Sequence, residues 1–249
     1  DLAARLLFAV SAAAFAGMCL LWRDADAWQT PSAIWKLPFG HIVGLILMAL
    51  QIVSAVGVLV RPQTRVFAWL LTAVFAVWCL TAIPGIVAHP RAWAAYGAIF
   101  EQLAPLCGAL ALTAATGAKT DSTHRLDTAA RIGIGLCALA FAASQAVYFA
   151  FTASFVPTWI PPSPGFWTWF TTAAFAIAGI AILANRQERR AAGLLALMMG
   201  LFGLLVWVPR VFAHPGAHGD WSECLLTFLI TGGTAVVYRS LSPRRGRRR

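Results

Sequence analysis

The sequence predicts an all-α, polytopic membrane protein with eight transmembrane helices, arranged as two tandem four-helix bundles in parallel orientation. Three observations lead to this fold class. Of the 249 residues, 60% are hydrophobic and only 11% are charged, against roughly 25% charged in soluble domains. The apolar residues form eight long runs, and the positive charges gather between alternate runs. This composition excludes a soluble globular enzyme, a disordered chain and a nucleic-acid-binding domain.

Each apolar run is long enough to cross a bilayer, which takes about 20 helical residues. Only a helix satisfies its own backbone hydrogen bonds in lipid, and the runs lack the alternation of barrel strands. The remaining residues leave no room for a folded domain outside the membrane. We therefore predict spans at 3–22, 39–60, 66–88, 92–115, 131–152, 165–184, 191–213 and 222–240.

Lysine and arginine residues predict the orientation of these spans. Fifteen of the nineteen lie at the two termini or in the loops after spans two, four and six. Such an excess of positive charge marks the cytoplasmic side of a membrane. We therefore expect both termini in the cytoplasm, in a bacterial-type cytoplasmic (inner) membrane. The other four basic residues are Arg23, Lys36, Arg91 and Arg210.

The chain also has the pattern of an internal duplication. The dipeptide His89-Pro90 recurs 125 residues later as His214-Pro215. After the His-Pro dipeptides, a spacing that is three residues shorter aligns Glu101 with Glu223. At the same 125-residue spacing Gly40 matches Gly165, Arg61 matches Arg186, Arg65 matches Arg190, Pro84 matches Pro209 and Ala88 matches Ala213.

This duplication predicts the domain organisation. An even number of spans in each half gives the two halves the same orientation, related by an axis along the membrane normal. An inverted repeat is excluded by this count. We expect a first four-helix repeat at 1–116, a cytoplasmic linker at 117–128, a second repeat at 129–241 and a basic cytoplasmic tail at 242–249.

Short motifs within each half resemble the DoxX-like family of four-helix membrane proteins. These are an Arg at the start of the first helix, a Gly opening the second, a basic turn, a His closing the third and a Glu opening the fourth. The resemblance is strongest at Val208-Pro209-Arg210 and Trp221-Ser222-Glu223. It implies a subunit of a quinone-linked sulfur-oxidising system or a membrane anchor of a redox complex. The family often places an acid in the Gly-rich stretch that ends each unit, and Thr231-Gly232-Gly233 has none.

Three functions remain open at this point. The first is an integral membrane subunit associated with a redox system, interacting with quinone and partnered by a redox protein as an accessory subunit of an oxidoreductase. The alternatives are a small-solute transporter or channel and a non-catalytic membrane anchor or assembly protein. A transporter needs polar residues or broken helices near the midplane, and only Gln51 and Gln145 qualify. The five cysteines form no close pair, which weakens the case for a self-sufficient redox enzyme.

Candidate ligand or proton-site residues gather at the extracytoplasmic ends of the spans. Glu101 lies deepest, where an ionisable group costs roughly 2–3 kcal/mol and normally faces a partner or a wet cavity. It is either a proton acceptor and quinone-headgroup partner, with His89 nearby, or a structural hydrogen-bonding group. We expect Arg210 or His214 beside Glu223, and we expect a ligand site in the first half before the second. The candidates are His41, His89, Glu101, Arg210, His214 and Glu223.

A second group of side chains supplies possible metal ligands. Imidazole and carboxylate groups bind zinc, iron or copper, although Gly and Pro residues favour a solvated loop here. Two histidines are enough to ligate a haem, but no spacing demands it. The remaining partner is the lipid bilayer, with anionic lipid at the Arg-rich C-terminal tail. The four possible metal ligands are His214, His218, Asp220 and Glu223.

Overall fold

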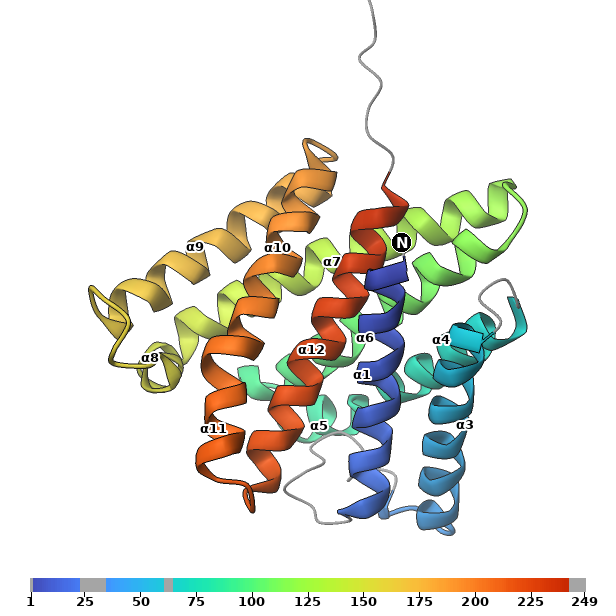
Figure 1. Ribbon diagram of the computed structural model, residues 1–249, viewed down its shortest axis with the longest axis horizontal. Coiled ribbons are helices and arrows are strands. Elements are labelled where there is room, and N and C mark those ends of the chain that lie inside the picture. The colour runs from blue at the N-terminus through green and yellow to red at the C-terminus, as the bar shows by residue number, and fades with distance from the viewer. Residues whose placement is uncertain (1, 23–34, 61–64, 242–249) are drawn as a thin grey trace, which may run out of the picture.

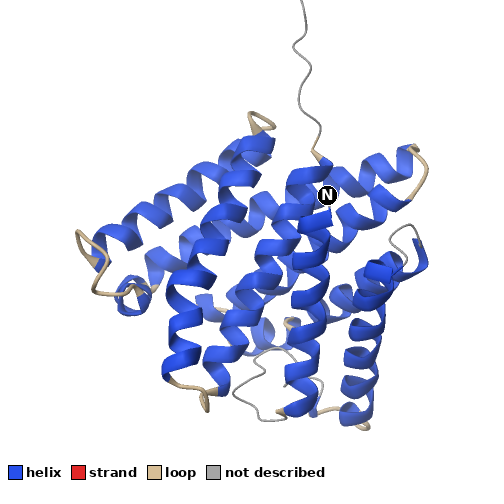
Figure 2. Cartoon of the chain, in the orientation of Figure 1, coloured by secondary structure: helices blue, strands red, loops and turns tan. Residues whose placement is uncertain are grey.

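The computed structural model describes residues 2–22, 35–60 and 65–241, and all regular secondary structure in these residues is helical (Figure 2). Within them, eight helical stretches are long and apolar enough to cross a membrane. This confirms the predicted all-α class and the predicted number of helices that are long and apolar enough to cross a membrane. Arg23, Arg61 and the predicted basic tail lie outside the described residues.

The third span of each half is interrupted near a proline. Pro84 and Pro209 lack the N–H group that would bond the carbonyl four residues earlier, so the helix changes form just before each of them.

The first four spans are α1 (Leu2–Leu21), α3 (Gly40–Val60), α4 (Arg65–Thr81) with α5 (Ile83–Ala88), and α6 (Trp93–Thr116). The others are α7 (Asp121–Val147) with α8 (Phe149–Phe155), α9 (Pro164–Leu183), α10 (Glu188–Phe202) with the π-helical η1 (Gly203–Trp207) and α11 (Val208–Ala213), and α12 (His218–Ser240).

The fifth span begins earlier than the sequence predicts. Thr120 and Thr123 cap the first turn of α7 reciprocally, since each hydroxyl oxygen accepts a hydrogen bond from the other residue's backbone N–H group (3.4 and 2.9 Å). Asp121 adds a negative charge at the N-terminus of the helix, where it is favourable. Within the predicted linker at 117–128, only residues 117–120 therefore lie outside a helix.

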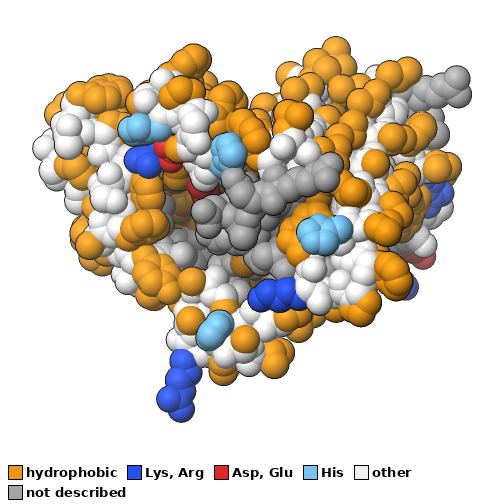
Figure 3. Space-filling model, turned by 90° about the horizontal axis from the view of Figure 1, so that it is seen from below, with side chains coloured by type: hydrophobic (Ala, Val, Ile, Leu, Met, Phe, Trp, Pro, Cys, Tyr) orange, Lys and Arg blue, Asp and Glu red, His pale blue; other side chains and the backbone are white. Residues whose placement is uncertain are grey.

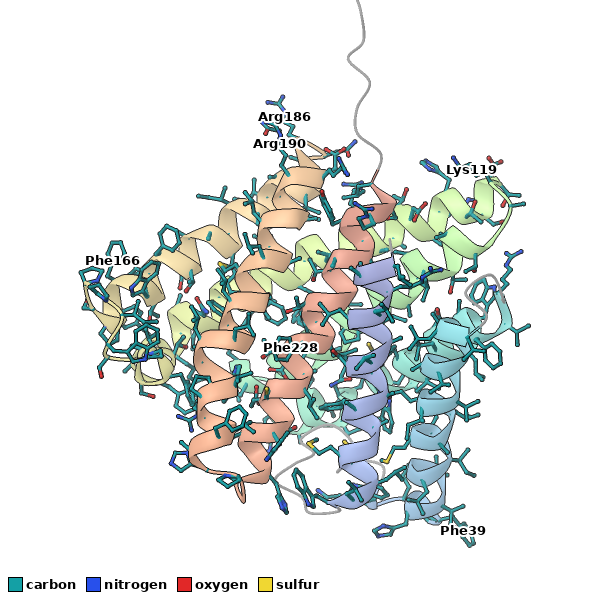
Figure 4. The ribbon with its side chains drawn as sticks, in the orientation of Figure 1. Phe39, Lys119, Phe166, Arg186, Arg190 and Phe228 are labelled. Carbon is teal, nitrogen blue, oxygen red and sulfur yellow. The ribbon has the colours of Figure 1, made fainter. Side chains whose placement is uncertain are left out.

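The bundle has two chemically different ends. Lys119, Arg186 and Arg190 lie at one of them, together with the start of α1 and the end of α12 (Figure 4). We call this the basic end. The opposite end carries the His-Pro turns that join α5 to α6 and α11 to α12, and we call it the turn end.

The two halves do not form separate four-helix bundles as expected. Figure 1 shows α1 between α3 and α12, so the first helix of the chain packs against the last. Likewise, α7 packs against α6, and α6 packs against α12. The first helix of each half therefore completes its packing on the fourth helix of the other half.

Glycines make the close approach between the halves possible. A side-chain carbon at Gly108 on α6 would overlap the Cα atom of Gly233 on α12. At Gly232 an added carbon would meet the backbone of Phe8 on α1, and at Gly133 on α7 it would meet the Cys107 sulfur. Small residues of this kind let membrane helices pack backbone against backbone. At the 125-residue spacing Gly108 matches Gly233, Cys107 matches Gly232 and Phe8 matches Gly133.

The two His-Pro turns have the same hydrogen bonds. Each histidine N–H group bonds a carbonyl four residues earlier, at 3.0 Å for His89 and 2.8 Å for His214. Tyr96 and Trp221 each donate a side-chain hydrogen bond to the carbonyl of the turn proline, at 3.0 and 3.1 Å. The spacing stays at 125 residues through both turns, so the three-residue shift that aligned Glu101 with Glu223 is wrong.

Candidate functional site

A cavity of about 600 Å³ lies in the second half of the chain, between α7, α8, α9 and the α10–η1 helix. Small-molecule sites commonly measure about 300–1,000 Å³ and are largely apolar with a few polar groups. This one fits that description, since most of its wall is aliphatic or aromatic. Its principal side chains are Gln145, Phe155, Trp167, Phe170, Thr171, Leu197, Leu201 and Trp207.

The cavity opens sideways through the gap between α9 and α10. Phe170 on α9 and Leu197 on α10 line it, yet their side chains are 53% and 59% exposed. In a helix that crosses a membrane, apolar side chains exposed to this extent face the hydrocarbon of the bilayer. These exposed apolar side chains therefore border the cavity on the outer side of α9 and α10.

Gln145 is the principal hydrogen-bonding side chain of the cavity wall. The hydroxyl groups of Thr171 and Thr172 each donate to its Oε1 atom at 3.0 Å. Within the described residues, its Nε2 atom has no hydrogen-bond partner. A polar group without a partner in an apolar environment costs about 1–3 kcal/mol. The amide nitrogen is therefore suited to donate to an acceptor on a bound molecule.

Arg210 joins the wall of the cavity to α12. Its Nε and Nη2 atoms both donate to Asp220 Oδ1 at 3.0 Å, and His214 Nδ1 lies 3.5 Å from Asp220 Oδ2. The Arg210 guanidinium also stacks over the Phe155 ring at 5.0 Å and the Trp207 ring at 5.7 Å. The sequence predicted Glu223 as the partner of Arg210. Asp220 takes that place because it lies in the first turn of α12, one turn nearer to α11.

The two membrane glutamates lie within electrostatic range of each other, and among the described residues neither forms an ion pair with a predicted base. Glu223 on α12 lies within electrostatic range of both Glu101 on α6 and Asp220. Among the described residues, no hydrogen bond or ion pair joins Glu101 to His89. The crossing of α6 and α12 accounts for this arrangement, since it brings the two helices together beyond the turns where the histidines lie.

The two first-half histidines occupy exposed positions at the turn end. His41 stacks on the Trp35 ring, with 4.8 Å between ring centres. His89 ends α5 and is exposed. Figure 3 views this end and shows hydrophobic side chains surrounding a few basic, acidic and histidine side chains. The predicted first-half site therefore does not bring His41, His89 and Glu101 together.

The four predicted metal ligands are also divided between different partners. His218 stacks on the Trp22 ring at 4.2 Å, while His214 approaches Asp220. Across the part of the chain that the structure describes, no group of three or more His, Cys, Asp or Glu side chains is arranged to hold a metal ion. The geometry therefore gives no support to the metal interpretation.

Sequence reasoning identified Gln145 and Arg210 but did not connect them through a cavity. The missing signal was the pair Thr171-Thr172 within an apolar run, which marks a polar spot facing a neighbouring helix. Phe155 and Trp207 carry no signal of their own, because aromatic residues are common at both ends of membrane helices.

Comparisons with known proteins add no further identification. No protein-family model, no curated protein and no solved structure matches this chain.

Proposed function

We propose that this protein is an integral membrane subunit that binds a lipid-soluble quinone in the cavity between α7, α9 and α10. The observation that carries the proposal is the lateral opening of this cavity toward lipid, combined with the unpartnered amide nitrogen of Gln145 in its wall. A quinone has a flat, uncharged ring for an aromatic-lined space and carbonyl oxygens that accept hydrogen bonds. Its alkyl tail extends through the gap between α9 and α10.

The chemistry of the wall favours a quinone over a charged lipid. The nearest basic side chain, Arg210, already donates twice to Asp220, so its charge is balanced. The hydrogen-bonding group in the wall is instead a neutral amide, which suits a neutral carbonyl. The resemblance to the DoxX-like family supports the same ligand class and adds a redox protein as the partner of this subunit.

We also infer that the chain arose by duplication of a four-helix unit and that its basic end faces the cytoplasm. Matching turn hydrogen bonds at a spacing of 125 residues and the crossing at Gly108 and Gly233 support the duplication. The basic residues at one end support the orientation. A cysteine at Lys119 should react with a membrane-impermeant thiol reagent only in opened cells, and one at Arg91 should react in intact cells. The opposite pattern contradicts this orientation.

Quinone binding is tested directly with purified protein in phospholipid nanodiscs containing decylubiquinone at a series of mole fractions. Trp167 and Trp207 line the cavity, so binding should quench tryptophan fluorescence saturably. Gln145→Leu removes the donor and should raise the Kd about tenfold, as expected for one hydrogen bond in an apolar site. Gln51→Leu is the matched control, because Gln51 is a buried amide outside the cavity, and it should bind like wild type.

Two results contradict the proposal. One is quenching by decylubiquinone that rises linearly without saturation in the wild type. The other is an unchanged Kd in Gln145→Leu.

A further inference from the structure

One end of the cavity is built from two aromatic side chains that contact each other and Arg210. Phe155 ends α8, Trp207 ends η1, and both line the cavity. Their ring centres are 5.3 Å apart, and the Arg210 guanidinium stacks over both rings. The two walls of the cavity, one from α7–α8 and one from α10–η1, therefore close on each other at this stack.

Asp220 holds the guanidinium in the stacking position. Two hydrogen bonds from Arg210 reach the same carboxylate oxygen, and the Asp220 side chain is only 10% exposed. A planar guanidinium held in this way keeps its face free for aromatic rings. Each such stack is worth about 0.5–2 kcal/mol, more where water is excluded.

We propose that Arg210 is a positioning residue for the quinone site, and that Asp220 on α12 fixes it there. The inference rests on the proposed function. Arg210 does not touch the quinone; it holds Phe155 and Trp207 as the wall against which the ring packs, and it closes the cavity to water from the turn end. The quinone site is in this way linked to α12, a helix that contributes no side chain to the cavity wall within the described residues.

The π-helical form of η1 agrees with this role. It contributes Leu205, Val206 and Trp207 to the cavity, and it lies directly before Pro209 and Arg210. Single π-helical turns are rare and occur often at functional sites. Here the wider turn presents three successive residues to the cavity.

The test compares decylubiquinone binding in nanodiscs among four variants. Arg210→Gln and Asp220→Asn should each raise the Kd about tenfold, from loss of the aromatic stack. Arg210→Lys keeps the charge beside Asp220 but lacks the planar face. It should retain the thermal stability of the wild type and still bind decylubiquinone more weakly. Arg91→Gln is the matched control, since Arg91 is an exposed arginine at the same end.

Arg210→Lys separates positioning from a purely structural ion pair. If the ion pair alone mattered, Arg210→Lys would bind like wild type, and the inference would be wrong. The emission of Trp207, obtained by subtracting the Trp207→Phe spectrum, should shift to longer wavelength in Arg210→Gln as water enters the stack.

The outcomes also separate this inference from the proposed function. Absence of saturable binding in the wild type overturns the proposed function itself. Saturable wild-type binding with an unchanged Kd in folded Arg210→Gln and Asp220→Asn overturns only the role of Arg210.

Discussion

The space enclosed by the first three helices is filled in the first half of the chain and open in the second. In the first half, Trp78 on α4 donates to Gln51 Oε1 on α3 at 2.8 Å, and Gln51 Nε2 donates to the Ala12 carbonyl on α1 at 2.8 Å. Gln51 is 1% exposed and Trp78 is 5% exposed. In the second half, α7, α9 and α10 surround the cavity.

The residues of the first-half network have different counterparts in the second half. At the 125-residue spacing, Gly203 stands in place of Trp78 and Ala176 in place of Gln51. Neither can form the hydrogen bonds of the first half, and the Phe228 ring on α12 packs directly against Gly203. The comparison teaches that one half has a satisfied polar network that holds three helices together, while the other half lacks that network and contains a cavity.

The contact between the halves should tolerate substitution least. Gly108→Ile places a branched side chain against the Gly233 backbone, so α6 and α12 must separate. We expect no folded, monodisperse protein after purification in detergent. Gly97→Ile is the matched control on α6, where nothing lies near the added atoms. A folded Gly108→Ile protein with wild-type melting temperature would contradict the close crossing.

The two glutamines should differ in their effect on stability. Gln51→Leu leaves the buried Trp78 Nε1–H without an acceptor and should lower the free energy of unfolding by about 1–3 kcal/mol. Gln145→Leu should cost under about 1 kcal/mol, since the Thr171 and Thr172 hydroxyl groups then donate instead to the Trp167 and Thr168 carbonyls, 2.9 and 2.7 Å away. Unfolding by sodium dodecyl sulfate measures both values. Equal losses would remove the distinction between a structural and a ligand-facing amide.

Filling the cavity should make the second half resemble the first. Ala174 lines the cavity, whereas the neighbouring Ala173 is exposed on the outer face of α9. Ala174→Phe should therefore raise the Kd for decylubiquinone at least about tenfold with no loss of stability, because the ring occupies existing space. Ala173→Phe adds the same side chain outside and should bind normally. Equal binding by the two variants would show that the cavity is not the site.

Local sequence determined the eight helices and the gathering of basic residues at one end. An apolar run of about 20 residues in lipid has only the helix to satisfy its backbone groups. The boundary that failed, at the start of α7, is also local: Thr120 and Thr123 form a capping box that overrides the polar composition of the segment. Gln51 likewise makes the interhelical hydrogen bonds that a polar residue in a span predicts.

Tertiary structure alone decided which helices meet and which charges pair. The sequence predicted an acidic partner for Arg210, but it predicted Glu223 where the structure has Asp220. The choice between these two acids depends on how α11 and α12 are rotated about their axes. The sequence also did not predict the cavity. An empty space is defined by where α7, α9 and α10 stop short of one another, and that distance is set by packing contacts such as those at Gly133 and Gly203, far apart in the chain.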